Sequence, residues 1–183
     1  MKKNKILWSV VAVFLCVVAY SGWYLGSYYI PKPAPYETHT VKVDKIIVEK
    51  ALRKLTLFSN NNIVDVFDIS LGAVPNGNKE KDYDGKTPEG IYVITHKHKD
   101  SRNLFTLQIS YPNKEDILEA RKRQIDLTQN VYIHGYPNVY PNWLGDLLLK
   151  NKDWTDGSIG ATNSKIEKLW GYVKIGTPIE IRP

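Results

Sequence analysis

The hydrophobic pattern over residues 41–72 alternates between apolar and polar positions and is interrupted by turn-forming residues. A period of two places every second side chain on one face of a strand. The pattern therefore predicts three strands, within residues 41–50, 51–60 and 62–72. Asparagines occupy positions 60–62, and they predict a hairpin tip because asparagine tolerates the backbone conformations of tight turns.

Further along the chain, the alternation predicts four more strands, within residues 90–95, 104–112, 130–135 and 177–183. Two segments show helical spacing instead, residues 114–124 and 163–173, and Asn163 is the expected N-cap of the second. Strands outnumber helices in this reading. The predicted fold class is therefore mainly β with a few helices (α+β).

The N-terminal segment differs in composition from the rest of the chain. Residues 6–25 carry no charge and follow Lys2, Lys3 and Lys5, so they predict a transmembrane segment whose basic start stays in the cytoplasm. We expect a signal anchor over residues 1–25, a proline-rich linker over residues 26–40 and one folded domain over residues 41–183. Ala19 and Ser21 also suit signal-peptidase cleavage, which would make the protein secreted.

Charge and cysteine content argue against nucleic-acid binding and against thiol chemistry in the exported part of the chain. The net charge is +6, and removing the three N-terminal lysines leaves +3 without a clustered basic face, so we expect no nucleic-acid partner. The single cysteine, Cys16, lies in the apolar run. The exported part therefore has no disulfide and no thiolate that could act as a nucleophile or metal ligand.

Two residues stand in positions suited to chemistry. His134 follows an apolar strand and precedes Gly135, which permits a sharp turn, and Ser158 follows Gly157 shortly before a predicted helix. Backbone amides at such a turn can stabilise negative charge. On residue type alone, both also suit structural roles, the histidine as a hydrogen-bonding group and the serine as a turn residue.

A metal-dependent hydrolase using His96, His98 and His134 is an alternative, because alternate histidines on a strand share one face. Charged residues surround the pair, and no carboxylate–histidine motif accompanies it. We therefore expect no metal and no cofactor.

From about residue 54 to residue 183 the chain resembles the catalytic domain of the YkuD-type L,D-transpeptidases, most closely their YafK-like branch. The resemblance rests on the ordered segments ISLGAVPNGNKEKDYDGKTPEG, SYPNKEDILEA, YIHGYPN, DWTDGSIGATNSKIEKLW and GTPIEI. It implies a YkuD-like β-sandwich catalytic domain behind the N-terminal membrane segment.

The resemblance also implies residue roles. Ser158 falls on the family's catalytic cysteine, His134 on its general acid/base, and Gly157 with its neighbours on the oxyanion-binding amides. Asp156 lies where many relatives have histidine and Gly160 where many have arginine, which puts the usual handling of a substrate carboxylate in doubt. The expected substrate-binding residues are Tyr136, Asp156, Ile159 and Gly160.

The activity implied by the resemblance is acyl transfer or hydrolysis at the diaminopimelate carbonyl of wall peptide stems. Crosslinking, attachment of a lipoprotein to the wall and its detachment share one acyl-enzyme. The expected partners are peptidoglycan peptide stems, a wall-attached lipoprotein and the inner membrane, through residues 6–25. The expected location is a bacterial inner membrane, crossed once, with the catalytic domain in the periplasm or at the outer face.

Serine at position 158 predicts poor turnover, because an alcohol needs a base during attack whereas a thiol is already partly thiolate. Two origins fit this serine: a replaced cysteine in a site built for a thiol, and a site adapted to serine. The remaining alternative is a non-catalytic cell-wall-binding relative.

Overall fold

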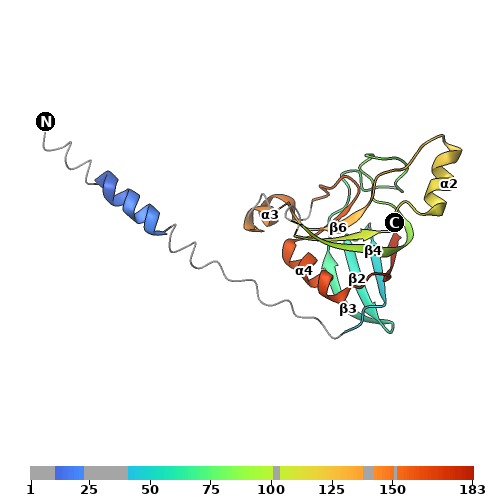
Figure 1. Ribbon diagram of the computed structural model, residues 1–183, viewed down its shortest axis with the longest axis horizontal. Helices are drawn as coiled ribbons and strands as arrows, with labels where there is room; N and C mark the ends of the chain where they lie inside the picture. The colour runs from blue at the N-terminus through green and yellow to red at the C-terminus, as the bar shows by residue number, and fades with distance from the viewer. Residues whose placement is uncertain (1–10, 23–40, 101–103, 138–141, 151) are drawn as a thin grey trace. The chain divides into compact units, whose positions relative to one another are not determined.

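The structure of the chain, a computed structural model, describes residues 11–22, 41–100, 104–137, 142–150 and 152–183 (Figure 1). Contacts divide the chain into two units, Met1–Glu37 and Thr38–Pro183. In the first unit, residues 11–22 form a helix. Within the described ranges, no helix combines the length and hydrophobicity that a bilayer crossing requires. The predicted linker, residues 26–40, lies outside the described residues. The membrane segment and the linker stay predictions.

The second unit is built on one eight-stranded sheet with strand order β3-β2-β1-β8-β4-β5-β6-β7. The strands are β1 Lys45–Glu49, β2 Lys54–Ser59, β3 Asn62–Asp68, β4 Gly90–Asp100, β5 Leu104–Ile109, β6 Tyr132–His134, β7 Ile159–Gly160 and β8 Pro178–Arg182. The helices are α2 Lys114–Lys122, α3 Asn142–Leu149 and α4 Asn163–Tyr172. The mainly β class is confirmed.

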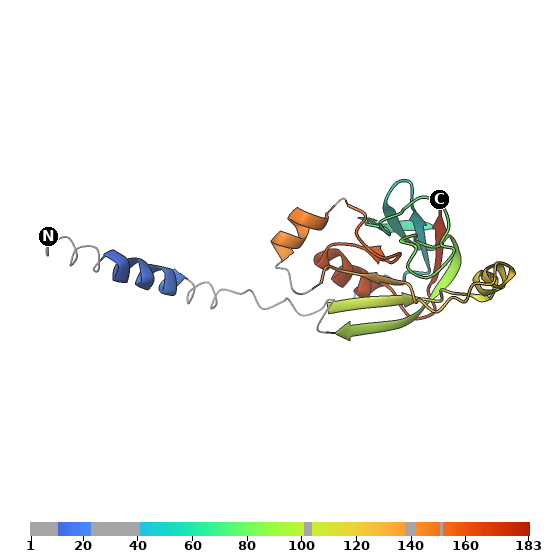
Figure 2. The same cartoon turned by 90° about the horizontal axis from the view of Figure 1, so that it is seen from above.

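One continuous, curled sheet replaces the two separate sheets expected of a sandwich (Figures 1 and 2). Strand β4 joins the two halves, because its first residues pair with β8 and its later residues pair with β5. The segment after β3 meets the far edge strand β7, where the amides of Ser70 and Gly160 each donate to the other's carbonyl, at 2.7 and 2.8 Å. This bridge draws residues from the first and last parts of the domain together.

A register shift in β4 decides which face its histidines occupy. Ile94 is buried opposite Ile109, and the register shifts before His96, which lies opposite Gln108. A shift of one residue moves side chains to the other face of a sheet. His96 and His98 therefore share the sheet face of Gln108, away from the buried core.

Helix α4 packs on β5 and β6 and buries Ile166 and Leu169. Its N-cap is Thr162, which has an extended backbone and whose hydroxyl accepts from the amide of Lys165 at 3.4 Å. The predicted cap, Asn163, is instead the first helical residue, and it is buried. Sequence pattern alone could not separate these two adjacent cap-forming residues.

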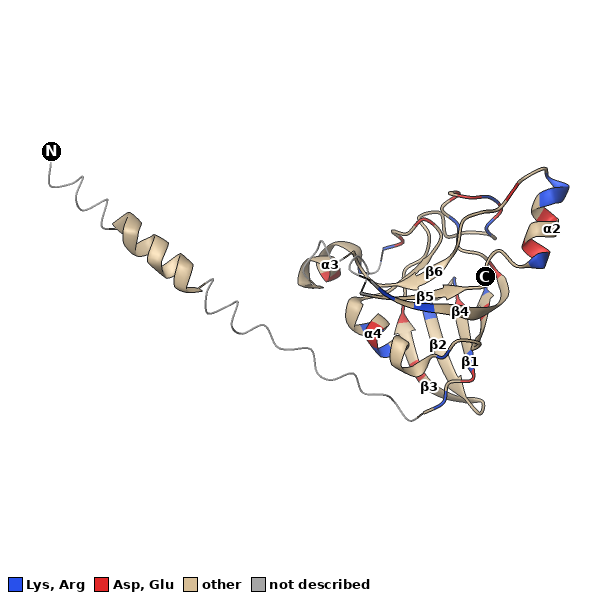
Figure 3. Ribbon diagram, viewed as in Figure 1, with Lys and Arg blue, Asp and Glu red and all other residues tan. Residues whose placement is uncertain are grey.

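Helices α2 and α3 lie at opposite ends of the domain in both views (Figures 1 and 2). Charges of both signs lie along α2 (Figure 3), which begins with a capping box between Asn113 and Asp116. Helix α3 and strand β7 were not predicted. Gly145 of α3 lies so close to Tyr136 that an added Cβ would be 2.4 Å from its ring.

Candidate active site

His134 is the last residue of β6 and lies between β5 and β7, opposite Thr106 on one side and Gly160 on the other. Its Nδ1 is 2.9 Å from the carbonyl oxygen of Gly135. A carbonyl can only accept, so this contact places the proton on Nδ1 and leaves Nε2 as the basic nitrogen. The imidazole and the indole of Trp154 form a T-shaped contact, with 5.3 Å between the ring centroids.

Ser158 lies at the end of a tight turn, one residue before β7. Its hydroxyl oxygen accepts from the backbone amide of Tyr132 at 3.2 Å, so it lies against the strand that carries His134. The turn is anchored at Thr155, whose amide donates to Leu71 at 3.2 Å and whose carbonyl accepts from Ala73 at 2.9 Å. A strand, and not a helix N-terminus, follows Ser158 directly.

The two residues meet in one groove of about 510 Å³. The side chains that line it come from the loop before β4, the segment around β6 and the turn before β7. They are Tyr83, Thr128, Gln129, Asn130, Tyr132, His134, Trp154, Thr155, Asp156 and Ser158. The convergence of His134 with Ser158 agrees with the expected arrangement, and their catalytic roles stay predictions.

Gly157 has a left-handed backbone, with φ of +104°. A Cβ there would lie 2.5 Å from the carbonyl oxygen of Lys86 and 3.1 Å from Nζ of Lys79. Both the conformation and the space therefore require glycine before Ser158. This turn was predicted to supply the oxyanion-binding amides, a role that remains a prediction.

A buried ion pair lies behind the turn. The Lys79 side chain is fully buried, and its Nζ is 2.9 Å from Oδ1 of Asp84. Burial would raise the pKa of Asp84, but hydrogen bonds from the Glu80 amide, the Lys79 ammonium and the Lys86 amide outweigh it and hold this pKa below its usual value. The sequence showed only charged loop residues here and no sign that one was buried.

Of the predicted substrate-binding residues, Asp156 lines the groove. Tyr136 does not: it is buried, and burial, reinforced by the Asp146 carboxylate, raises its pKa to about 12. Ile159 is fully buried in the core, opposite the equally buried Ile133 of β6. Neither side chain lines the groove, and their role in substrate binding stays a prediction.

Gly160 is also withdrawn from the groove. Its amide and carbonyl are both bonded to Ser70, and a Cβ would lie 2.7 Å from Cζ2 of Trp154. The indole occupies the space into which a side chain at this position would project. A glycine at position 160 is therefore needed to leave room for Trp154. The sequence offered no sign that these two residues are in contact.

The metal-hydrolase alternative fails on geometry. Strand β5 separates His98 on β4 from His134 on β6, so two strand spacings, roughly 9–10 Å, lie between the histidines' backbones. Among the described residues, no group of three or more acidic, histidine or cysteine side chains is suited to hold a metal.

Comparison with known proteins places this architecture. The model of the L,D-transpeptidase catalytic domain, named YkuD, matches residues 44–181. The chain belongs to this family. Curated protein sequences gave no match to this L,D-transpeptidase-family chain.

Solved structures resemble the L,D-transpeptidase-family chain in fold. Bd1075 from Bdellovibrio bacteriovorus is 24% identical, with TM-score 0.54, over 80% of this chain and 50% of that one. The helical cell shape determining protein Pgp2 from Campylobacter jejuni is 19% identical, with TM-score 0.58, over 76% and 47%. An L,D-transpeptidase from Mycobacterium smegmatis is 14% identical, with TM-score 0.50, over 76% and 58%. The chain thus spans about half the length of the first two.

Proposed function

We propose that this L,D-transpeptidase-family protein acts on the peptide stems of peptidoglycan, as an acyl transferase or hydrolase at the diaminopimelate carbonyl. Ser158 in place of a cysteine makes it a slow form. The observation that carries the proposal is that His134, at the end of β6, and Ser158, in the turn before the neighbouring strand β7, line one groove. In this family the two positions hold the base and the nucleophile.

The proposed reaction has two steps. The side chain at position 158 attacks the carbonyl carbon, while Nε2 of His134 takes its proton and then gives that proton to the departing amine. The acyl group then passes to an entering amine or to water. Backbone amides of the 156–158 turn would stabilise the oxyanion.

Serine slows the first step for a chemical reason. A hydroxyl must lose its proton during attack, whereas a thiol at neutral pH already has a small thiolate population. The Ser158 oxygen also accepts from the Tyr132 amide, which lowers its electron density further. Binding of the stem depends on the groove and not on this atom.

The likeness of the chain to the YafK-like branch favours a detaching activity on a wall-attached lipoprotein over crosslinking or attachment. Pgp2, a relative of the same fold, is named for determining helical cell shape, and a part in cell shape belongs to the proposal. The proposed location is a bacterial inner membrane, with residues 6–25 as a single span and the domain at the outer face.

Reversion of the serine tests this function. Ser158→Cys should release product from purified wall peptides at least about 10²-fold faster than the unaltered chain, as followed by mass spectrometry. Serine and cysteine are similar in size, so both forms should fold alike. Equal rates in the two forms would contradict a site built for a thiol.

A second candidate, a non-catalytic wall-binding protein, is favoured by Ser158 itself. It predicts that the unaltered chain and its His134→Ala variant bind isolated sacculi equally in a pelleting assay. It also predicts no product from Ser158→Cys, which separates it from the enzyme proposal.

A further inference from the structure

The side-chain amide of Gln129 is bonded at both ends, to two segments distant in sequence. Its Oε1 accepts from the backbone amide of Tyr83 at 2.8 Å, and its Nε2 donates to the carbonyl oxygen of Asp156 at 3.0 Å. Gln129 also lines the groove that holds Ser158. One half-buried side chain thus joins three of its walls.

Asp82 strengthens the same junction from the other direction. Its carboxylate accepts from the Thr128 amide at 2.9 Å, the Thr128 hydroxyl at 2.6 Å and the Gln129 amide at 3.1 Å. Partial burial would raise the pKa of Asp82, but these donors outweigh it and lower the pKa. We name the reciprocal contacts of Asp82 and Gln129 the Asp82–Gln129 clamp.

The bond to Asp156 acts on the turn beside the nucleophile position. A peptide unit is planar, and its carbonyl and N–H point in opposite directions. Holding the Asp156 carbonyl therefore sets the direction of the Gly157 amide, one residue before Ser158. Gly157, at φ of +104°, would otherwise leave this unit much rotational freedom.

The bond to Tyr83 supports a strained residue at the rim. Tyr83 has φ of +56°, a left-handed conformation that is uncommon for residues other than glycine, and is 75% exposed. Such strain persists only where surrounding contacts compensate for it. The clamp supplies that compensation, because Asp82 and the Tyr83 amide are both bonded to residues 128–129.

We propose that Gln129 is a positioning residue: its amide sets the Asp156–Gly157 peptide unit beside position 158 and holds the Tyr83 rim in the same arrangement. This inference rests on the proposed function for its meaning in catalysis, but the structural coupling is measurable without a substrate. Gln129 contacts neither reacting atom; it acts through the turn and the rim.

The first test compares two glutamine-to-methionine changes in full chains that carry Ser158→Cys. Gln129→Met removes both bonds at similar size, whereas Gln124→Met, on the exposed turn after α2, is the matched control. Iodoacetamide alkylation of the thiol at position 158 is measured against pH, with Cys16 replaced by serine in every chain. Gln129→Met should raise the midpoint by about one pH unit, a ten-fold slower reaction well below it.

A merely structural role would lower the melting temperature and leave that pH midpoint in place, and this result would overturn the proposal. A midpoint shift of equal size in Gln124→Met would overturn it as well. The measurement uses no wall peptide. Its outcome can therefore be distinguished from a failure of the proposed function.

Gln129→Glu then separates the two ends of the amide in the Ser158 chain. An ionised glutamate keeps an acceptor for the Tyr83 amide but has no donor for the Asp156 carbonyl. Hydrogen exchange should stay slow at Tyr83 and become at least about ten-fold faster at Tyr132, whose amide is bonded to Ser158. An unchanged exchange rate at the Tyr132 amide would contradict the proposed coupling between Gln129 and the turn.

Discussion

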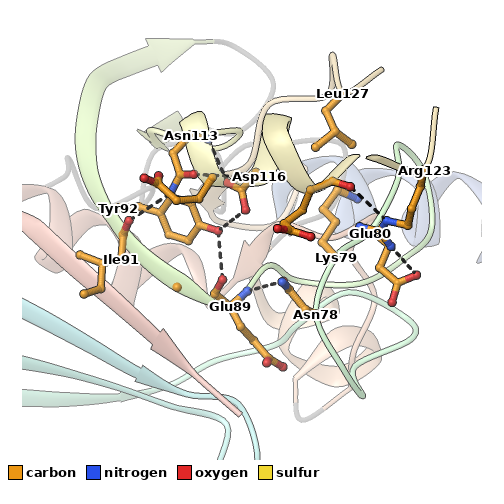
Figure 4. Close-up of a pocket in the computed structure, with 13 residues that line it drawn as sticks. Asn78, Lys79, Glu80, Glu89, Ile91, Tyr92, Asn113, Asp116, Arg123 and Leu127 are labelled. Atoms are coloured by element: carbon orange, nitrogen blue, oxygen red, sulfur yellow. Dashed lines mark hydrogen bonds and ion pairs between the residues drawn. The ribbon is translucent and has the colours of Figure 1, made fainter. Parts of the chain in front are cut away.

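Two hollows of nearly equal size lie on this domain, and they differ in what their polar groups do. The groove that holds His134 and Ser158 has a volume of about 510 Å³. A second pocket, between the start of β4 and helix α2, has a volume of about 530 Å³ (Figure 4). Size therefore does not distinguish them.

The polar groups of the second pocket serve the fold. Asp116 accepts from the Asn113 amide at 2.9 Å as part of the capping box of α2, and from the Tyr92 hydroxyl at 3.2 Å (Figure 4). Arg123 forms an ion pair of 3.1 Å with Glu80 across the pocket. The groove, by contrast, is lined by both an imidazole and a serine hydroxyl. Complementary chemistry, and not volume, therefore distinguishes the candidate site from the second pocket.

The largest expected effect is the loss of activity when the histidine of the groove is replaced, compared with the replacement of a histidine outside the groove. In chains with Ser158→Cys, His134→Ala should lower the rate of product release from wall peptides by about 10²–10⁴-fold, the usual worth of a general acid/base. His98→Ala, on the same sheet face but two strands away, should stay within two-fold. A similar loss in both variants would remove the distinction.

A smaller effect concerns the backbone of the groove. Gly157→Ala combines a left-handed conformation with a Cβ 2.5 Å from a backbone oxygen, so we expect a loss of about 3 kcal/mol in unfolding free energy or more. Gly176→Ala, at φ of +89° with nothing within 4 Å of its Cβ, should lose only about 1–2 kcal/mol. Urea unfolding measures both, and equal losses would contradict the close approach at Gly157.

The smallest expected effect concerns the pH dependence of stability, which should have opposite signs for a carboxylate beside the groove and one in the second pocket. The pKa of Asp82, beside the groove, is lowered from 3.8, so its contribution to stability is present above pH 3.8 and is lost as the pH falls. Burial raises the pKa of Asp116 from 3.8, so the stability of its protonated form is full below pH 3.8 and is lost as the pH rises.

Asp82→Asn should therefore be most destabilising at neutral pH, and its penalty should shrink in acid. For Asp116→Asn, the pH-dependent part of the change in unfolding free energy should increasingly favour the variant as the pH rises. Solvent screening keeps both changes below about 1 kcal/mol. Unfolding midpoints from pH 3 to pH 7 measure them, and slopes of the same sign would show that the two carboxylates do not differ as described.

The first half of the sheet was predictable because its determinants are local. Alternation defines β1, β2 and β3, and Asn60 and Asn61 adopt the positive φ of a tight turn. Helix α2 likewise carries its capping box within four residues. Strand β7 was missed because two residues are too few to show a period.

The site was predictable in its residue types but not in its assembly. Motifs at family spacing pointed to His134 and Ser158, which line one groove, yet Tyr136, Ile159 and Gly160 lie in the same motifs and do not line it. Adjacency in a motif does not say which side chains face the groove. That depends on strand register and on which space is already filled, as Trp154 fills the space over Gly160.

By itself, the sequence determined seven of the eight strands of the described sheet, two helices, the glycine before Ser158 and membership of a family. Periodicity, turn chemistry and motifs are written in neighbouring residues. Only the tertiary structure decided that the Tyr132 amide meets Ser158, that Lys79 is buried behind the turn and that Gln129 joins Tyr83 to Asp156. These contacts join residues dozens of positions apart. Their geometry is set by the register and curl of the sheet, to which every strand contributes.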